Sequence, residues 1–382
     1  MGGISAAYHN PLSINPTNPA TLADIGLTTF EVGGDADHVE IGTNDSSYTG
    51  DFGSVSHLAL AFPVNFGRWG AAISFKPYCS VRYNFARDIA DSQIGDFSEI
   101  YSRRGHLYTV MLSNGVKYKG FSLGAGLGFM FGHIDYSKII FFPSSSGALS
   151  SRNVSENTYR GFVYNLGAQY RLKITGSERA SKKKDPIYFT IGAYGSSSVG
   201  IRVKSINYWQ RFDIRTNGEL VRDTIGNLIQ QKSTTTIPAY LGSGISFDLP
   251  GRWLIGVDFK YNFYSQFDSK TNKDAFADNF RFSAGTEYSP DRYSKNFLKQ
   301  MIYRVGGFGG TSELVTESGQ LNEWGVTAGL GFPVRKAGSL LNLGFEFKNR
   351  GTISSSQFNE KYYTFSLGLI INDRWFIKRK FD

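Results

Sequence analysis

The feature that most constrains this chain is a two-residue alternation of apolar and polar side chains over long segments. In WLIGVDFKYNF (253–263) every second residue is Trp, Ile, Val, Phe or Tyr, and mostly small or polar residues stand between them. Similar patterns recur at 121–132, 324–332, 341–348 and 363–372. Side chains alternate between the two faces of a strand, whereas a helix gives a period of about 3.6 residues. The chain is therefore predicted to be all-β.

The length of these segments separates a membrane barrel from a soluble sandwich. They run to about ten residues or more, which suits a tilted membrane strand and exceeds the ~5–6 residues usual in soluble strands. Their apolar face often ends in aromatic residues, and the other face carries Gly, Ser, Asn and charges that suit a wet lumen. No helix is expected to span a membrane, because no apolar run is long enough. We expect a transmembrane antiparallel β-barrel.

The number of segments supports a closed barrel. About fourteen strands are predicted, an even number of the kind that bacterial single-chain barrels have. They are 26–42, 52–64, 68–85, 104–118, 120–137, 156–174, 187–215, 228–248, 252–266, 275–289, 299–314, 321–334, 339–349 and 361–374. Tight turns alternate with longer connections, which include 43–51, 86–103, 138–155 and 213–227. The stretch 187–215 is too long for a regular strand, so we expect a bulge near Gly195–Gly200.

The N-terminal residues differ from the rest. Residues 1–24 include NPLSINPTNPATLA, which is too long for a simple tail and too polar to cross a membrane. We expect residues 1–24 to fold into the lumen as a hatch, and residues 25–382 to form the barrel. The chain starts with neither a basic stretch nor an apolar one, so it shows no signal peptide. For a protein of the bacterial outer membrane, we expect that the signal peptide has been removed or is missing here.

Chemistry-bearing motifs are scarce. Cys79 is the single cysteine, which excludes disulfides and CxxC sites. The five histidines form no i,i+4 pair, and neither HExxH nor GxSxG occurs. Ser56 and His57 are adjacent and are expected to point to opposite faces of a strand. The net charge is +9, but the aromatic residues lie on apolar faces rather than beside basic residues. We expect no enzymatic activity, no cofactor, no metal and no nucleic-acid partner.

Several short motifs follow one another in a recognisable order. Gly2-Gly3 is followed by Asn18-Pro19-Ala20, and further blocks lie at 61–85, 303–335 and 366–382. In this order they resemble the FadL-type family of outer-membrane long-chain fatty-acid transporters, in its Bacteroidota-like branch. The resemblance covers most of the chain. It implies a fourteen-stranded barrel, a hatch that plugs the periplasmic side and carries the Asn-Pro-Ala motif, and a kinked third strand that opens the wall.

Pro77 gives the expected kink a physical basis. It lies, with Tyr78 after it, in the middle of the predicted third strand. Proline has no N–H to donate to a strand ladder, so a mid-strand proline predicts a local break in pairing. The resemblance makes this break a lateral gate, and Arg103, Arg104 and Arg281 are candidate partners for a fatty-acid carboxylate.

Two functions follow from these expectations. The first is passive uptake of hydrophobic compounds such as long-chain fatty acids, which bind in the lumen and leave sideways through the wall. The alternative is a non-transporting scaffold or accessory barrel that partners a secretion or assembly complex. A transporter should show an apolar tunnel ending near Pro77, whereas a scaffold should have a sealed lumen and a partner-facing surface. The expected partners are outer-membrane lipid and a hydrophobic ligand, and we expect a monomer, with specificity carried by 86–103 and 138–155.

Overall fold

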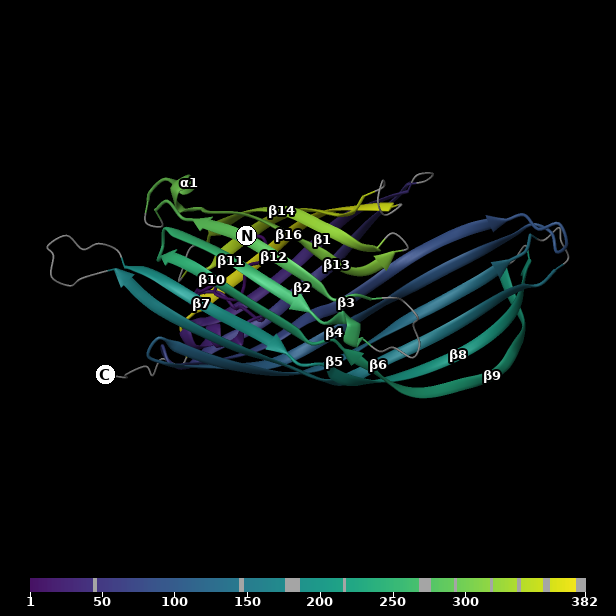
Figure 1. The fold of residues 1–382 in the computed structure, drawn as a ribbon, viewed down its shortest axis with the longest axis horizontal. Coiled ribbons are helices and arrows are strands. Elements are labelled where there is room, and N and C mark those ends of the chain that lie inside the picture. The colour runs from purple at the N-terminus through teal and green to yellow at the C-terminus, as the bar shows by residue number, and fades with distance from the viewer. Residues whose placement is uncertain are drawn as a thin grey trace.

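A closed antiparallel sheet makes up almost the whole structure. A computed structural model describes residues 1–43, 47–143, 148–175, 186–215, 218–267, 276–291, 294–316, 319–334, 338–352 and 358–375. Within them, sixteen strand segments form one closed sheet, in which the fifth strand pairs with the sixth and the first strand of the chain pairs with the last. Figure 1 shows the strands running obliquely along an elongated barrel. None of the described helices is long and apolar enough to cross a membrane.

The strands follow one another around the barrel in chain order. The first eight are β1 (Thr28–Thr43), β2 (Ser47–Asn65), β3 (Trp69–Ile89), β4 (Phe97–Tyr118), β5 (Phe121–Phe141), β6 (Ser150–Thr175), β7 (Ile187–Ser196) and β8 (Val199–Arg215). The rest are β9 (Gly218–Ile237), β10 (Tyr240–Leu249), β11 (Trp253–Asn262), β12 (Asn279–Tyr288), β13 (Ile302–Thr316), β14 (Gly319–Pro333), β15 (Leu340–Gly351) and β16 (Phe358–Asp373). Three short helices complete the described elements, namely η1 (Pro19–Asp24), η3 (Tyr264–Gln266) and α1 (Phe297–Gln300).

Two barrel positions are each shared by two segments. β7 and β8 both pair with β6, one after the other along its length. In the same way β9 pairs with β8, and β10 pairs with β7. The sixteen segments therefore occupy fourteen positions, which confirms the predicted antiparallel barrel of about fourteen strands. The interruption between β7 and β8 falls within Gly195–Gly200, where the sequence predicts an irregularity.

The two faces of the wall differ as the alternation requires. In β11, Trp253, Ile255 and Phe259 are exposed on the outside, whereas Leu254 and Asp258 are buried on the inside. Large apolar side chains are exposed over the outer face of the barrel, with Phe162 66% exposed. A soluble protein would not expose so continuous an apolar surface, but it is what lipid chains cover in a membrane.

The barrel is much taller on one side than on the other. β3 to β6 have 21, 22, 21 and 26 residues, whereas β10, β11 and β12 have ten each. The long strands, together with β8 and β9, extend well beyond the others at one end of the molecule (Figure 1). We call this extension the tall wall.

The tall wall corrects part of the predicted strand map. Much of the predicted loops 86–103 and 213–227 is strand, because β3, β4, β8 and β9 continue into them. The predicted loop 43–51 is likewise shortened by β2, and 138–155 by β5 and β6. Beyond a membrane both faces of a strand are wet, so the apolar alternation stops although the ladder continues. Residues 176–185, which make up most of the connection between the predicted strands 156–174 and 187–215, lie outside the described residues.

Residues 1–27, which we call the N-terminal segment, lie inside the barrel. They lie at the end where tight turns such as 66–68 and 119–120 connect the strands, which we call the short-turn end. The helix η1 contacts β3 to β6, and residues 5–7 reach β6, β10 and β11. Inward glycines leave room for it. A Cβ on Gly192 would lie 1.9 Å from the Ala6 carbonyl oxygen, and one on Gly70 would lie 2.0 Å from that of Leu22. The segment and the barrel wall are therefore fitted to each other at backbone distance.

Candidate functional site

The Asn-Pro-Ala motif shapes the N-terminal segment. Asn18 is fully buried, and its Oδ1 accepts a hydrogen bond from the Ala20 N–H (3.1 Å), which caps η1. Its Nδ2 donates to the Ala6 carbonyl (2.7 Å), so one side chain ties two parts of the segment together. Pro19 occupies the start of η1, where a missing N–H costs nothing. The motif thus folds the segment upon itself.

Asp258 on β11 fixes the segment to the barrel. Its carboxylate accepts hydrogen bonds from the backbone N–H groups of Ser5 (2.6 Å) and Ala6 (2.7 Å). Gln169 on β6 donates to the Ala6 carbonyl (2.8 Å), and Ser246 on β10 donates to that of Ala7 (2.7 Å). Three strands therefore satisfy the backbone of residues 5–7, as buried peptide groups require.

The lower edge of the segment is held by ion pairs. Asp24 lies 2.6 Å from Lys117 Nζ and 3.2 Å from His9 Nε2. Burial opposes the ionisation of Asp24, but hydrogen bonds from His9 and Lys117 outweigh it and lower its pKa to about 2. Nearby, Arg171 contacts the His9 ring (2.6 Å) and pairs with Asp248 (2.5 Å).

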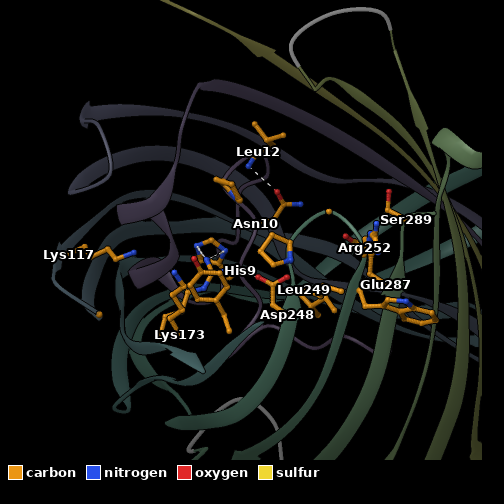
Figure 2. A pocket seen from close by; sticks show the side chains of 18 of the residues that line it. His9, Asn10, Leu12, Lys117, Lys173, Asp248, Leu249, Arg252, Glu287 and Ser289 are labelled. Carbon is orange, nitrogen blue, oxygen red and sulfur yellow. Dashed lines mark hydrogen bonds and ion pairs between the residues drawn. The ribbon is translucent and has the colours of Figure 1, made fainter. Parts of the chain in front are cut away.

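These groups line a pocket of 580 Å³ at the short-turn end. Figure 2 shows His9, Lys117 and Asp248 converging on it, with Lys173 and Arg252 at its margins. The pocket lies between the N-terminal segment and the ends of β4, β6, β10 and β11. Since Arg171 pairs with Asp248 and Lys117 pairs with Asp24 of the N-terminal segment, we interpret this pocket as part of what holds the segment in place.

A second cavity, of 650 Å³, lies in the lumen above the N-terminal segment, and Pro16 and Thr17 form part of its lining. One side of it is apolar, with the buried side chains Leu107, Met130, Ile134, Tyr159 and Ile201 packed together. We call this space the luminal cavity. Its size is within the range of small-molecule sites, and its lining combines an apolar wall with a few charged groups, as such sites do.

The charged groups of the luminal cavity are mostly basic. Lys76, Lys260 and Arg103 line it, together with the acid Glu313. Ionisable side chains at membrane depth are costly, and they face the interior where they serve a function or find a partner. The Lys260 ammonium lies 5.3 Å from the centre of the Tyr240 ring, a cation–π contact within the same cavity.

The three arginines named as carboxylate partners lie in three different places. Arg103 lines the luminal cavity. Arg104, the next residue on β4, is exposed on the outer face because consecutive strand residues point to opposite sides. Arg281 lies over the Phe308 ring (3.5 Å) and donates to the Gly2 carbonyl (3.4 Å), so it contacts the N-terminal segment instead.

Two basic residues of the luminal cavity were not among the predicted site residues. Lys76 directly precedes the strand-breaking Pro77, and Lys260 lies on the inward face of the clearest alternating segment, 253–263. Lysine in the inward register of a membrane strand is the signal that points to them. It does not tell which inward lysines meet in one cavity, since that depends on strand register.

The strand ladder breaks beside Pro77. β2 and β3 pair only from Leu58↔Phe75 toward the short-turn end, and beyond that pair β2 keeps β1 as partner while β3 keeps β4. The β3–β4 register also shifts between Pro77 and Cys79. Pro77 and Tyr78 both line the luminal cavity, and Tyr78 is 44% exposed. The cavity therefore reaches the place where the wall loses its hydrogen bonds.

The arrangement of Ser56 and His57 differs from the sequence expectation. The β1–β2 register shifts between Gly33 and Gly34, so Ser56 has no partner on β1, and its Oγ lies 3.1 Å from His57 Nδ1. A bulge thus brings together two side chains that regular alternation would separate. His57 Nε2 lies 3.6 Å from Glu31, whose other oxygen accepts from the Ile14 N–H (2.7 Å). The group links β1 and β2 to the N-terminal segment.

The fold and lumen define an outer-membrane type of β-barrel, which is closed, apolar outside and occupied by its own N-terminal segment. The chain belongs to the BamG family, whose model matches residues 1–382. Comparison with curated protein sequences found no match.

Two solved structures with the same fold are toluene transporters. The toluene transporter TodX of Pseudomonas putida has a TM-score of 0.60 and 15% identity over 97% of this chain and 95% of its own. The toluene transporter TbuX of Ralstonia pickettii has a TM-score of 0.58 and 14% identity over 97% and 96%. At such identities the likeness establishes the fold.

Proposed function

We propose that this barrel lies in the bacterial outer membrane and takes up hydrophobic compounds passively through the luminal cavity. The observation that carries the proposal is the contact between this cavity and the ladder break at Pro77. A ligand that enters from the tall-wall side meets the N-terminal segment below it and a weakened wall beside it. Pro77 and Tyr78 then form the lateral gate, and the N-terminal segment is the hatch that closes the direct route.

The lining suggests an amphipathic ligand with a negative head. Each CH₂ group transferred from water to an apolar wall contributes about 0.8 kcal/mol, so a long acyl chain gains most from this cavity. Lys76, Lys260 and Arg103 supply the positive charge for a carboxylate, and Glu313 is the one acid among the described lining residues. Long-chain fatty acids, as in the FadL-type transporters of the Bacteroidota-like branch, combine these two properties.

A binding experiment on purified protein tests this assignment. We expect mass spectrometry to find acyl lipids that co-purify with the barrel. We also expect Lys260→Met to weaken fatty-acid binding by about 10- to 100-fold, which corresponds to the free energy of one charge-assisted hydrogen bond. Binding of an uncharged hydrocarbon should change little in this variant. Lys173→Met at the short-turn end removes a charge outside the cavity and is the matched control. Absence of any acyl ligand, with normal uptake in a deletion strain, would overturn the transport proposal.

A second candidate is the accessory barrel of a secretion or assembly complex. It is favoured by the tall wall, because β8 and β9 extend far past the short strands and the described residues of 205–231 do not line the luminal cavity (Figure 1). A variant in which a short turn replaces residues 205–231 distinguishes the two candidate functions. An accessory barrel would lose its partner and impair the assembly of other outer-membrane proteins while retaining ligand binding. A transporter would show altered uptake with normal assembly.

A further inference from the structure

The outer face of the tall wall carries a compact group of cations. Arg160 on β6 is the direct cross-strand neighbour of Arg202 on β8, and Lys204 on β8 is that of Lys232 on β9. Arg202 and Lys204 are two residues apart on β8, so all four side chains point to the same face, and all four are exposed. We call them the outer cationic cluster.

This arrangement is unfavourable for the protein alone. Like charges directly opposite each other on neighbouring strands destabilise a sheet, and here two such pairs lie next to each other. Among the described residues, no hydrogen bond or ion pair joins the four side chains to another group. Glu156 lies on the same face of β6, and its carboxylate accepts a hydrogen bond from the Tyr208 hydroxyl (3.1 Å). Within the part of the chain that the structure describes, none of the four cations therefore has an ion-pair partner.

The cluster lies directly at the edge of the apolar surface. The outward residues of β6 below it include Phe162, Leu166, Tyr170 and Ile174, which are 66%, 54%, 43% and 55% exposed. From 162 to 174 the strand runs for about 40 Å, and a tilt of ~45° projects this onto ~28 Å, close to the hydrocarbon thickness of a bilayer. Arg160 is the next outward residue after Phe162, so the cluster begins where the headgroups begin.

We propose that the outer cationic cluster binds the phosphate groups of a phosphorylated glycolipid of the outer leaflet, of the lipid A type. The cluster lies at the end of the apolar belt away from the N-terminal segment, which in the proposed outer-membrane placement is the outer leaflet. Two arginines offer forked donors for phosphate oxygens, and two lysines add point charges. Phe162 and Leu166 below them contact the acyl chains of the same lipid. The inference rests on the outer-membrane placement and not on transport.

Titration of the purified barrel with defined lipids in mixed micelles tests the proposal. The probes are diphosphoryl lipid A, the same lipid without phosphates, and phosphatidylglycerol. We expect the wild-type protein to prefer diphosphoryl lipid A. The double variant Arg202→Gln, Lys204→Gln should bind it about 30-fold more weakly, since each cation near an anionic lipid surface contributes about 1 kcal/mol.

The tall wall also offers a matched control. Arg211 on β8 is exposed but paired with Asp223 (3.0 Å), so Arg211→Gln should leave lipid A binding nearly unchanged. Arg202→Lys, which keeps the charge, should retain most of the binding and shows that a loss is not due to misfolding. Equal binding of the dephosphorylated lipid, equal binding of phosphatidylglycerol, or undiminished binding by the double variant would each overturn the proposal.

Discussion

The lower and upper parts of the lumen are enclosed by the same strands but hold different contents. In the lower part, inward residues are glycines and short polar groups, and the N-terminal segment fills the space at backbone distance. In the upper part, inward residues are Met, Tyr, Leu and Lys, and a cavity of 650 Å³ is left open. Both parts satisfy the alternation of a membrane strand. The identity of the inward residues therefore decides which part of the lumen the N-terminal segment fills and which part stays open as a cavity.

The largest expected effect comes from Asp258, which holds the lower part together. Asp258→Ala leaves the N–H groups of Ser5 and Ala6 buried without an acceptor, at a cost of about 1–3 kcal/mol each. We expect the N-terminal segment to detach, measured as faster cleavage within residues 1–24 by an added protease, while the barrel stays intact. Asp258→Asn keeps an acceptor oxygen and should show a smaller change. Unaltered protection in Asp258→Ala would show that the segment is held elsewhere.

The next effect is steric and tests the close fit of the segment. In Gly192→Ala the new Cβ would meet the Ala6 carbonyl oxygen at 1.9 Å, so the segment must move, at a cost of up to about 3 kcal/mol. Gly309→Ala is the control, because its Cβ would find its nearest neighbour at 3.9 Å. Hydrogen exchange of residues 5–7 should accelerate in the first variant only. Equal exchange rates in the two variants would argue against a backbone-tight fit.

Low pH should loosen the segment through Asp24. Its pKa is lowered from 3.8 to about 2, so ionised Asp24 contributes about 2 kcal/mol that is fully present above about pH 4. This contribution is lost as the pH falls through about 2, because the folded form must then take up a proton. Acid protease at pH 2 should reach the segment more readily than at pH 4. In Asp24→Asn the pH step should shrink, and an unchanged step would assign it to another group.

The last prediction concerns Pro77, where we expect the smallest change in stability, although uptake should fall. Pro77→Ala restores a backbone donor beside the ladder break and should lower uptake a few-fold. Barrel stability should change little, because Pro77 is only half-buried and belongs to none of the buried clusters of the described residues. Cysteines at positions 57 and 76, which would be opposite if the β2–β3 ladder continued, offer a reversible closure. Oxidation should block uptake relative to the reduced form of the same variant, which is the baseline because Lys76 is absent from both forms. Normal flux in both cases would remove the lateral gate from the mechanism.

The sequence predicts this barrel well where membrane chemistry dictates the pattern. Segments 253–263 and 121–132 alternate because lipid requires apolar residues on one face, so their strands and faces agree with β11 and β5. The tall wall was missed because water on both sides removes that requirement around 86–103 and 213–227. The bulge at Ser56 and His57 also escaped prediction, because neither of these two positions of β2 is a glycine or a proline that would indicate it.

The site was predictable only in part, for a similar reason. Pro77 stands out because its chemistry is local, and Arg103 lines the cavity as the inward member of a pair. Arg104 and Arg281 could not be placed from the sequence, because one lies across the wall and the other contacts Gly2, which is 279 positions away in the chain. Such contacts depend on register and on where the N-terminal segment lies.

The course of the N-terminal segment has a consequence for how the barrel is assembled. Described ladders join neighbouring barrel positions in chain order, except the one between β1 and β16, whose residues come from opposite ends of the chain. That closing ladder cannot form until the last strand has been synthesised. The segment leads directly into Thr28, the first residue of β1 in this ladder. A segment already seated against β4, β5 and β6 would present β1 in place, and so act as an internal template for barrel closure.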